Sequence, residues 1–165
     1  MIQITAFVKK KMIIIIRLQH FFRIALYKNK KMNLNIPVSE LMTQKVVTVS
    51  SSQKLVDVKH IFEKKEFHHH IPVVDNGKLT GIISLIDFLY AIKSASLDDT
   101  EEVYNTQLVK DIMHENPITK PSLATLRDIS EELAKGEVHA IVIADDGVLK
   151  GIVSTADVIR FFLSH

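Results

Sequence analysis

The segment "IPVVDNGKLTGIISLID" at residues 71–87 decides the fold, because it returns as "IVIADDGVLKGIVSTAD" at residues 141–157. The two copies keep their aspartates, glycines and serine in register at an offset of 70 residues. Upstream, "VSELMTQKVVTV" from Val38 matches "VKDIMHENPITK" from Val109 at an offset of 71. Such self-similarity indicates two structural units of one kind. Units of about 60 residues bury little surface alone, so we expect each to complete the other's core.

Each copy predicts the order strand, helix, strand, turn, strand, helix. The first unit is expected to contain a strand at Val46–Val49, a helix after the N-cap candidates Ser50–Ser52, a strand at His70–Val74, a turn at Asp75–Gly77, a strand at Lys78–Ser84 and a helix at about Leu85–Ile92. The second is expected to contain a strand at Ile118–Thr119, a helix with Leu126, Ile129 and Leu133 on one face, a strand at Ala140–Ala144, a strand at Val148–Ser154 and a helix at 157–163. The polar, acidic stretch between the units is interpreted as a connecting segment or the fraying end of a helix.

Each returning strand ends at a hydroxyl residue that an aspartate follows three residues later, in "GIISLID" and "GIVSTAD". At the start of a helix this places a hydroxyl, free backbone N–H groups and a carboxylate around one spot. A carboxylate there can accept two hydrogen bonds from a vicinal diol, as acidic residues do on ribose. The alternative is that the pair only caps the helix. The repetition of the element favours a ligand site.

These motifs resemble the CBS domain in its tandem arrangement, the Bateman module, over about Ile36 to Leu163. The resemblance implies an α/β fold of two βαββα units related by a pseudo-two-fold axis, each with a small three-stranded sheet and two helices. It implies unit 1 at 36–96, a connecting segment at 97–108 and unit 2 at 109–165. It also implies ribose contacts from Ser84 and Asp87 in one cleft, and from Ser154, Thr155 and Asp157 in the other. Ile86 and Ala156 stand where the family often has a further hydroxyl, which implies weaker or altered ribose binding.

By the same resemblance His69 and His70 take the place of a phosphate-facing His-Arg pair, and His139 and Ala140 are their counterparts. Histidine is a weaker phosphate anchor than arginine at neutral pH, so we expect phosphate-bearing ligands to favour the first cleft and mildly acidic pH. The adenine is expected among Thr48, Ile71 and Pro72, or among Ile141 and Val142 in the second cleft.

Other chemistry is disfavoured. Adjacent strand residues point to opposite faces, so His68, His69 and His70 do not form a ready metal site. The sequence has neither a G-x-S-x-G elbow nor a Gly-rich phosphate loop, so we predict no enzyme activity and no required cofactor. The absence of cysteine excludes disulfides and thiol nucleophiles and fits the cytoplasm.

Residues 1–31 are basic and partly apolar, with eight of the chain's 21 basic residues and no acid. The remainder holds 13 basic against 19 acidic residues, so we expect no nucleic-acid partner. For residues 12–27 three interpretations stay open: a helix on a membrane surface, a segment packed on the domain or on a second copy, or a stretch outside a native protein that starts at Met32.

We therefore predict a regulatory module that binds AMP, ADP, ATP or another adenosine derivative, forms a homodimer and signals to an effector protein or another copy. The alternative is an interaction or scaffold protein that keeps the fold and has lost useful ligand binding.

Overall fold

The computed structural model describes residues 32–64, 69–93 and 95–164. All helices and strands below lie in the compact unit Leu34–His165. The interpretations of residues 1–31, and His68, fall outside the described residues. The elements in chain order are η1 (Val38–Glu40), α2 (Leu55–Phe62), β1 (His70–Asp75), β2 (Lys78–Ser84), α3 (Leu85–Ile92), α4 (Glu102–Thr106), η2 (Val109–Asp111), β3 (His114–Glu115), β4 (Thr119–Lys120), α5 (Leu126–Ala134), β5 (Ala140–Asp145), β6 (Val148–Ser154) and α6 (Thr155–Ser164).

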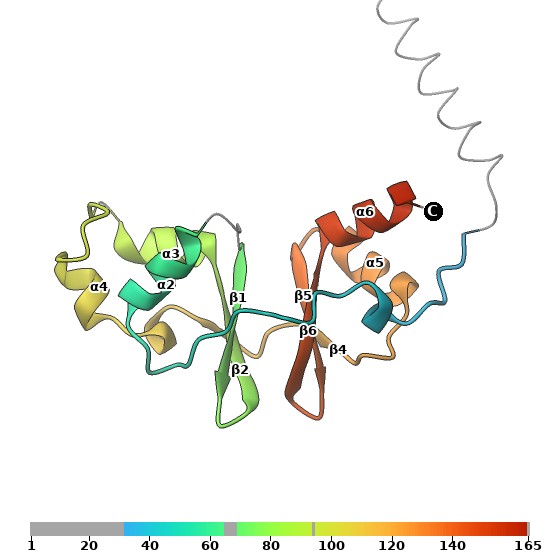
Figure 1. The fold of residues 1–165 in the computed structure, drawn as a ribbon, viewed down its shortest axis with the longest axis horizontal. Coiled ribbons are helices and arrows are strands. Elements are labelled where there is room, and N and C mark those ends of the chain that lie inside the picture. Colours follow the sequence, from blue (N-terminus) through green and yellow to red (C-terminus); the bar gives the residue numbers. More distant parts are fainter. Residues whose placement is uncertain (1–31, 65–68, 94, 165) are drawn as a thin grey trace, which may run out of the picture. The chain divides into compact units, whose positions relative to one another are not determined.

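Two three-stranded sheets, β1-β2-β3 and β4-β5-β6, lie where the two halves meet, and the helices lie on their outer sides (Figure 1). The hairpins β1-β2 and β5-β6 are antiparallel and shift register at matching places, between Val73 and Val74 and between Ile143 and Ala144. Their turns contact each other, since the amide of Leu79 donates to the carbonyl of Gly147 at 2.8 Å. The predicted α/β architecture of two repeated units is confirmed.

The strand predicted at Val46–Val49 is wrong, because only Val49 pairs there, in a single parallel bridge to Val73. To extend that pairing, the residue at position 72 would have to donate its amide, and Pro72 has none. The second half carries Val142 at the matching position, and its amide donates to the carbonyl of Ile118 at 3.3 Å. Strand β4 therefore pairs with β5 in the second sheet, and residues 46–49 form no matching strand beside β1.

The two halves exchange the segments that begin each repeat. Val38 is fully buried in the core of the second half, and its amide donates to the carbonyl of Ala124 at 2.7 Å. Val109 is fully buried in the core of the first half, and its amide donates to the carbonyl of Gln53 at 2.8 Å. The predicted mutual completion of the cores is confirmed.

The same exchange explains the glycine that opens each strand-end element. A Cβ at Gly81 would lie 2.8 Å from the sulfur of Met113, and one at Gly151 would lie 2.7 Å from that of Met42. These methionines follow η2 and η1 on the exchanged segments, which run across β2 and β6. Glycine is required at both places because another chain segment passes too close for a side chain.

The connecting segment is also part of the first core. It contains α4, whose Tyr104 is fully buried and stacks on Phe88 at a centroid distance of 6.2 Å. The Tyr104 hydroxyl donates to the carbonyl of Ser96 at 2.8 Å. Lys59, which is buried on α2, donates to the carboxylate of Asp99 at 2.6 Å. Through these contacts the connecting segment packs on the first unit. The polar composition of the segment did not indicate this packing.

Candidate functional site

The two strand-end elements have the same local geometry. At the start of α3 the Asp87 carboxylate accepts hydrogen bonds from the Ser84 amide at 2.8 Å and the Ser84 hydroxyl at 2.6 Å. At the start of α6 Asp157 accepts the matching pair from Ser154 at 2.8 and 2.6 Å. The amides of both aspartates approach the serine oxygens in return, at 3.1 and 3.3 Å. Both elements are therefore capping boxes, and their ligand role stays a prediction.

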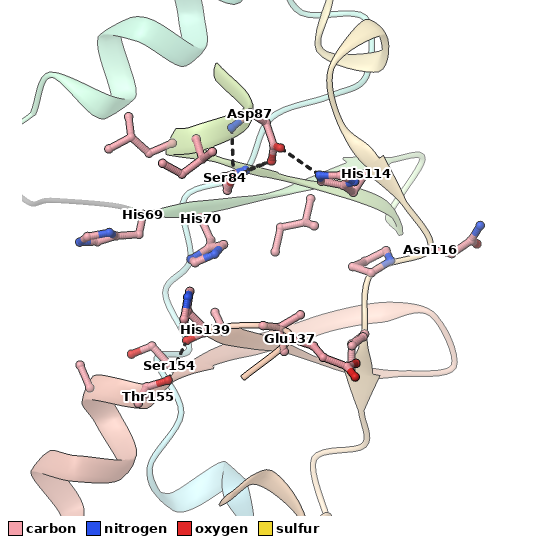
Figure 2. A pocket seen from close by; sticks show the side chains of 18 of the residues that line it. His69, His70, Ser84, Asp87, His114, Asn116, Glu137, His139, Ser154 and Thr155 are labelled. Carbon is pink, nitrogen blue, oxygen red and sulfur yellow. Dashed lines mark hydrogen bonds and ion pairs between the residues drawn. The ribbon is translucent and has the colours of Figure 1, made fainter. Parts of the chain in front are cut away.

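A cavity of about 910 Å³ lies between the two elements. The first repeat contributes His69, His70, Ile82, Ser84, Leu85, Ile86 and Asp87, and the second repeat contributes His114–Ile118, Glu137–Ala140 and Ser154–Ala156. Figure 2 shows His69, His70 and His139 between Ser84 and Asp87 on one side and Ser154 and Thr155 on the other. This volume falls at the upper end of the range for small-molecule sites. The sequence suggested two separate clefts. In the structure, residues predicted for each of them line one shared cavity.

Backbone hydrogen bonds place the histidines at the strand ends. The carbonyl of His69 accepts from the amide of Leu85 at 2.9 Å, and the carbonyl of His139 accepts from that of Thr155 at 3.0 Å. His70 follows directly at the start of β1 and is half-buried. Burial lowers the pKa of His70, and His69 and His139 lower it further, against a smaller opposing effect of Asp87. The unliganded cavity therefore holds an uncharged imidazole at neutral pH.

The two carboxylates differ in what holds their second oxygen. Asp87 Oδ1 lies 2.9 Å from Nε2 of His114, whereas Asp157 Oδ1 accepts from Arg160 at 2.8 Å within its own helix. Burial raises the pKa of Asp87, but the hydrogen bonds from Ser84 and His114 outweigh that effect and hold it below its usual value. Asp87 is therefore ionised at neutral pH and accepts hydrogen bonds only.

The structure places the predicted site residues in three groups. Seven line the cavity: His69, His70, Ser84, Asp87, His139, Ser154 and Thr155. Asp157 and the exposed Thr48 are not among the residues that line it. Ile71, Pro72, Ile141 and Val142 are buried on β1 and β5, because apolar strand residues serve the core first. Four of the five residues predicted to surround adenine are therefore core residues outside the cavity lining, and their ligand role stays a prediction.

Sequence reasoning missed one side of the cavity, formed by His114–Ile118 and Glu137. His114 belongs to β3, which pairs with β2 although it comes from the second repeat. The signal was available in the repeat itself: glycines at positions 81 and 151 imply a close crossing segment. Which segment crosses them cannot be read from spacing alone.

The described residues contain no group of three or more His, Cys, Asp or Glu side chains close enough to hold a metal ion. None of the helices in the described part of the chain is long and apolar enough to cross a bilayer. The exposed apolar side chains include Ile86, Leu89 and Tyr90 on α3 and Ile159, Phe162 and Leu163 on α6.

Several known proteins resemble this chain in sequence or in structure. The uncharacterized protein MJ0188 of Methanocaldococcus jannaschii is 36% identical over 128 residues, which are 77% of this chain and 44% of that protein. This chain thus spans less than half of that relative's length. The CBS-pair protein CBSX2 of Arabidopsis thaliana, solved in complex with AMP, has a TM-score of 0.67 at 25% identity over 78% of this chain and 97% of its own.

The CBS domain pair of protein MJ0100 was solved with 5′-methylthioadenosine and S-adenosyl-L-methionine. It has a TM-score of 0.64 at 25% identity over 77% of this chain and 99% of its own. The family model for the CBS domain matches twice, at residues 38–94 and 109–164. The two matches coincide with the repeats that build the two halves, and the chain belongs to the CBS-domain family.

Proposed function

We propose that this chain is a regulatory module that binds an adenosine-containing nucleotide between its two units and passes the resulting change to a partner. The observation that carries the proposal is the cavity that joins Ser84 and Asp87 to His69 and His70. A ribose diol would meet the Asp87 carboxylate, and a phosphate would meet the histidines at the strand entry. The AMP complex of CBSX2 and the adenosine-type ligands of MJ0100 support the ligand class.

A ligand held by both halves would change how they pack, because the cavity has walls from each half. Such a ligand shifts the balance between two arrangements only by its difference in affinity for them. The partner that senses the change is an effector chain or a second copy. Exposed apolar residues lie on α3 and on α6, and interfaces commonly cover such side chains, which supports a homodimer.

A thermal-shift screen tests the ligand. AMP, ADP, ATP, adenosine, S-adenosylmethionine and inorganic phosphate are compared, and a ligand at 100 times its dissociation constant adds about 2.7 kcal/mol to the free energy of unfolding. Asp87→Asn is expected to abolish that gain. The proposal is wrong if no adenosine compound raises the melting temperature, or if Asp87→Asn and wild type gain equally.

The chain offers a matched control for that variant. Thr125 and Asp128 form the same capping box at the start of α5, with hydrogen bonds of 2.8 and 2.7 Å, and neither lines the cavity. Asp128→Asn weakens a helix cap just as Asp87→Asn does. It should lower the melting temperature without changing the ligand-induced gain.

A second candidate function is that of an interaction module without a ligand. The observation that favours it is that both carboxylates already have full capping partners, with His114 and Arg160 on their remaining oxygens. A flat thermal-shift response together with a stable dimer would favour this second function over the first.

A further inference from the structure

His114 is hydrogen-bonded to Asp87 Oδ1, an oxygen that a ribose diol would need as an acceptor. A carboxylate has about four lone-pair positions, and three of those on Asp87 are engaged: two by Ser84 and one by His114. A diol that binds through both hydroxyls requires two. One existing hydrogen bond must therefore break before ribose can bind in that manner.

The bond to His114 is the one that breaks most easily. The bond from the Ser84 amide belongs to the capping box of α3, so breaking it would open the helix start. Both Ser84 bonds are on Oδ2, whereas His114 is on Oδ1. The His114 side chain is 71% exposed, whereas that of Asp87 is 18% exposed. An imidazole so accessible to water regains its hydrogen bonds from solvent when it leaves.

We infer that His114 is a displaceable latch on the first ribose site. Its hydrogen bond occupies Asp87 Oδ1 when no ligand is bound, and that bond breaks when a vicinal diol binds. The inference rests on the proposed function, since the displacing group is the ribose of the adenosine compound. The latch lowers the affinity for every ligand that uses the diol and leaves ligands without one unaffected. His114 thus determines how selectively the first half responds to ribose.

The latch also links ligand binding at Asp87 to the second half of the molecule. His114 lies on β3, which pairs with β2 through Ile82 and Gly81. Four residues after β3 ends, the chain enters β4 of the second sheet at Thr119. Release of His114 therefore frees a side chain of the segment that leads from one sheet into the other. Asp157 has no such connection, because Arg160 on the same helix holds it.

Titration calorimetry with adenosine tests the latch, using wild type, His114→Ala, His114→Gln and the control His60→Ala, which removes an exposed histidine from Asp99 outside the cavity lining. His114→Ala should bind adenosine about two- to five-fold more tightly, the factor that corresponds to the loss of a competing hydrogen bond worth about 0.5–1 kcal/mol. His114→Gln keeps one donor and should lie between that variant and wild type. His60→Ala should equal wild type, and 2′-deoxyadenosine, which lacks the diol, should show no gain with His114→Ala.

The outcomes separate the latch from the proposed function. If adenosine binds wild type and His114→Ala equally well, or binds the variant more weakly, the latch is overturned and nucleotide binding stands. If adenosine binds only the variant, the latch is supported in its strongest form. If no adenosine compound binds either protein, both the latch and the proposed function are overturned. Melting curves of each variant confirm that it is folded.

Discussion

Met113 packs directly on Gly81, so that the exchanged segment of the second repeat lies across the strand that ends at the first candidate ribose element. A Cβ at position 81 would also lie 3.0 Å from the carbonyl oxygen of His114. The glycine of the repeated motif is therefore explained by chain packing.

Gly81→Ala should destabilise the protein by about 1–3 kcal/mol, as overpacking of a close contact does. Denaturant unfolding measures this free energy. Met113→Ala removes the nearer side-chain atoms, so the double variant should lose less than the sum of the two single losses. Strict additivity of the two losses would contradict the proposed contact between these residues.

Tyr104 is expected to make the connecting segment essential to the first core. Tyr104→Ala should cost about 3–5 kcal/mol, the range for large buried aromatic side chains. Tyr104→Phe keeps the ring and loses only the hydrogen bond to Ser96, so it should cost about 0.5–1.5 kcal/mol. Urea unfolding of the two variants provides the comparison. A small effect of Tyr104→Ala would show that the segment is a simple linker.

Acid should weaken the contact between the connecting segment and α2. Hydrogen bonds from Lys59 and then His60 hold the pKa of Asp99 below its usual value. A lowered folded-state pKa stabilises the protein above the unfolded-state value, and that stability is lost as the pH falls through the folded-state value. Asp99→Asn should therefore lower the melting temperature at pH 7 and make progressively less difference below about pH 4.

Asp146→Asn supplies the comparison for that pH series, because Asp146 is an exposed turn residue with a left-handed backbone that asparagine also adopts. Its melting temperature should follow wild type at every pH. A difference between Asp99→Asn and wild type that stays constant down to pH 3 would contradict the role of the Asp99 charge.

Binding of a phosphate-bearing ligand should be accompanied by proton uptake. Burial and the neighbouring histidines lower the pKa of His70 in the unliganded protein, so the imidazole is uncharged near pH 7. A bound phosphate favours the charged form and raises that pKa, so AMP should bind more tightly at pH 6 than at pH 8. Calorimetry in buffers of different ionisation enthalpy measures the proton taken up.

The contrast between ligands isolates this effect. Adenosine has no phosphate and should show no gain in affinity at pH 6, and His70→Ala should remove the gain for AMP. Equal affinity of AMP for wild type at pH 6 and pH 8 would refute the assignment of His70 to the phosphate.

The repeat allowed most of the fold to be predicted, because turn residues and hydrophobic periodicity are local signals. The hairpins and the helices α3 and α5 lie where the pattern indicated them. The strand at 46–49 failed because Pro72, a residue of another strand, lacks the amide that the pairing needs. The burial of Tyr104 and the approach of His114 to Asp87 also depend on contacts distant in sequence, which periodicity does not encode.

The residues of the candidate site that lie at the strand ends could be predicted from the sequence. The residues of the segment that crosses those strands could not. Ser84, Asp87 and the histidines before β1 and β5 line the cavity, as their positions beside the repeated turn and strand indicated. Ile71 and Ile141 were assigned to adenine, but their side chains are fully buried in the cores. The sequence alone does not distinguish an apolar strand residue of the core from one that lines a ligand site, because only the packing separates the two.

The placement of Val38 and Val109 means that the repeat seen in the sequence is not the unit that folds. A fragment cut in the connecting segment would carry Val38 away from the core that buries it and would leave the first core without Val109. We expect neither half to fold alone, whereas the two fragments mixed together should reassemble into the native pair. A single repeat on its own would be stable only as a dimer that exchanged these same segments.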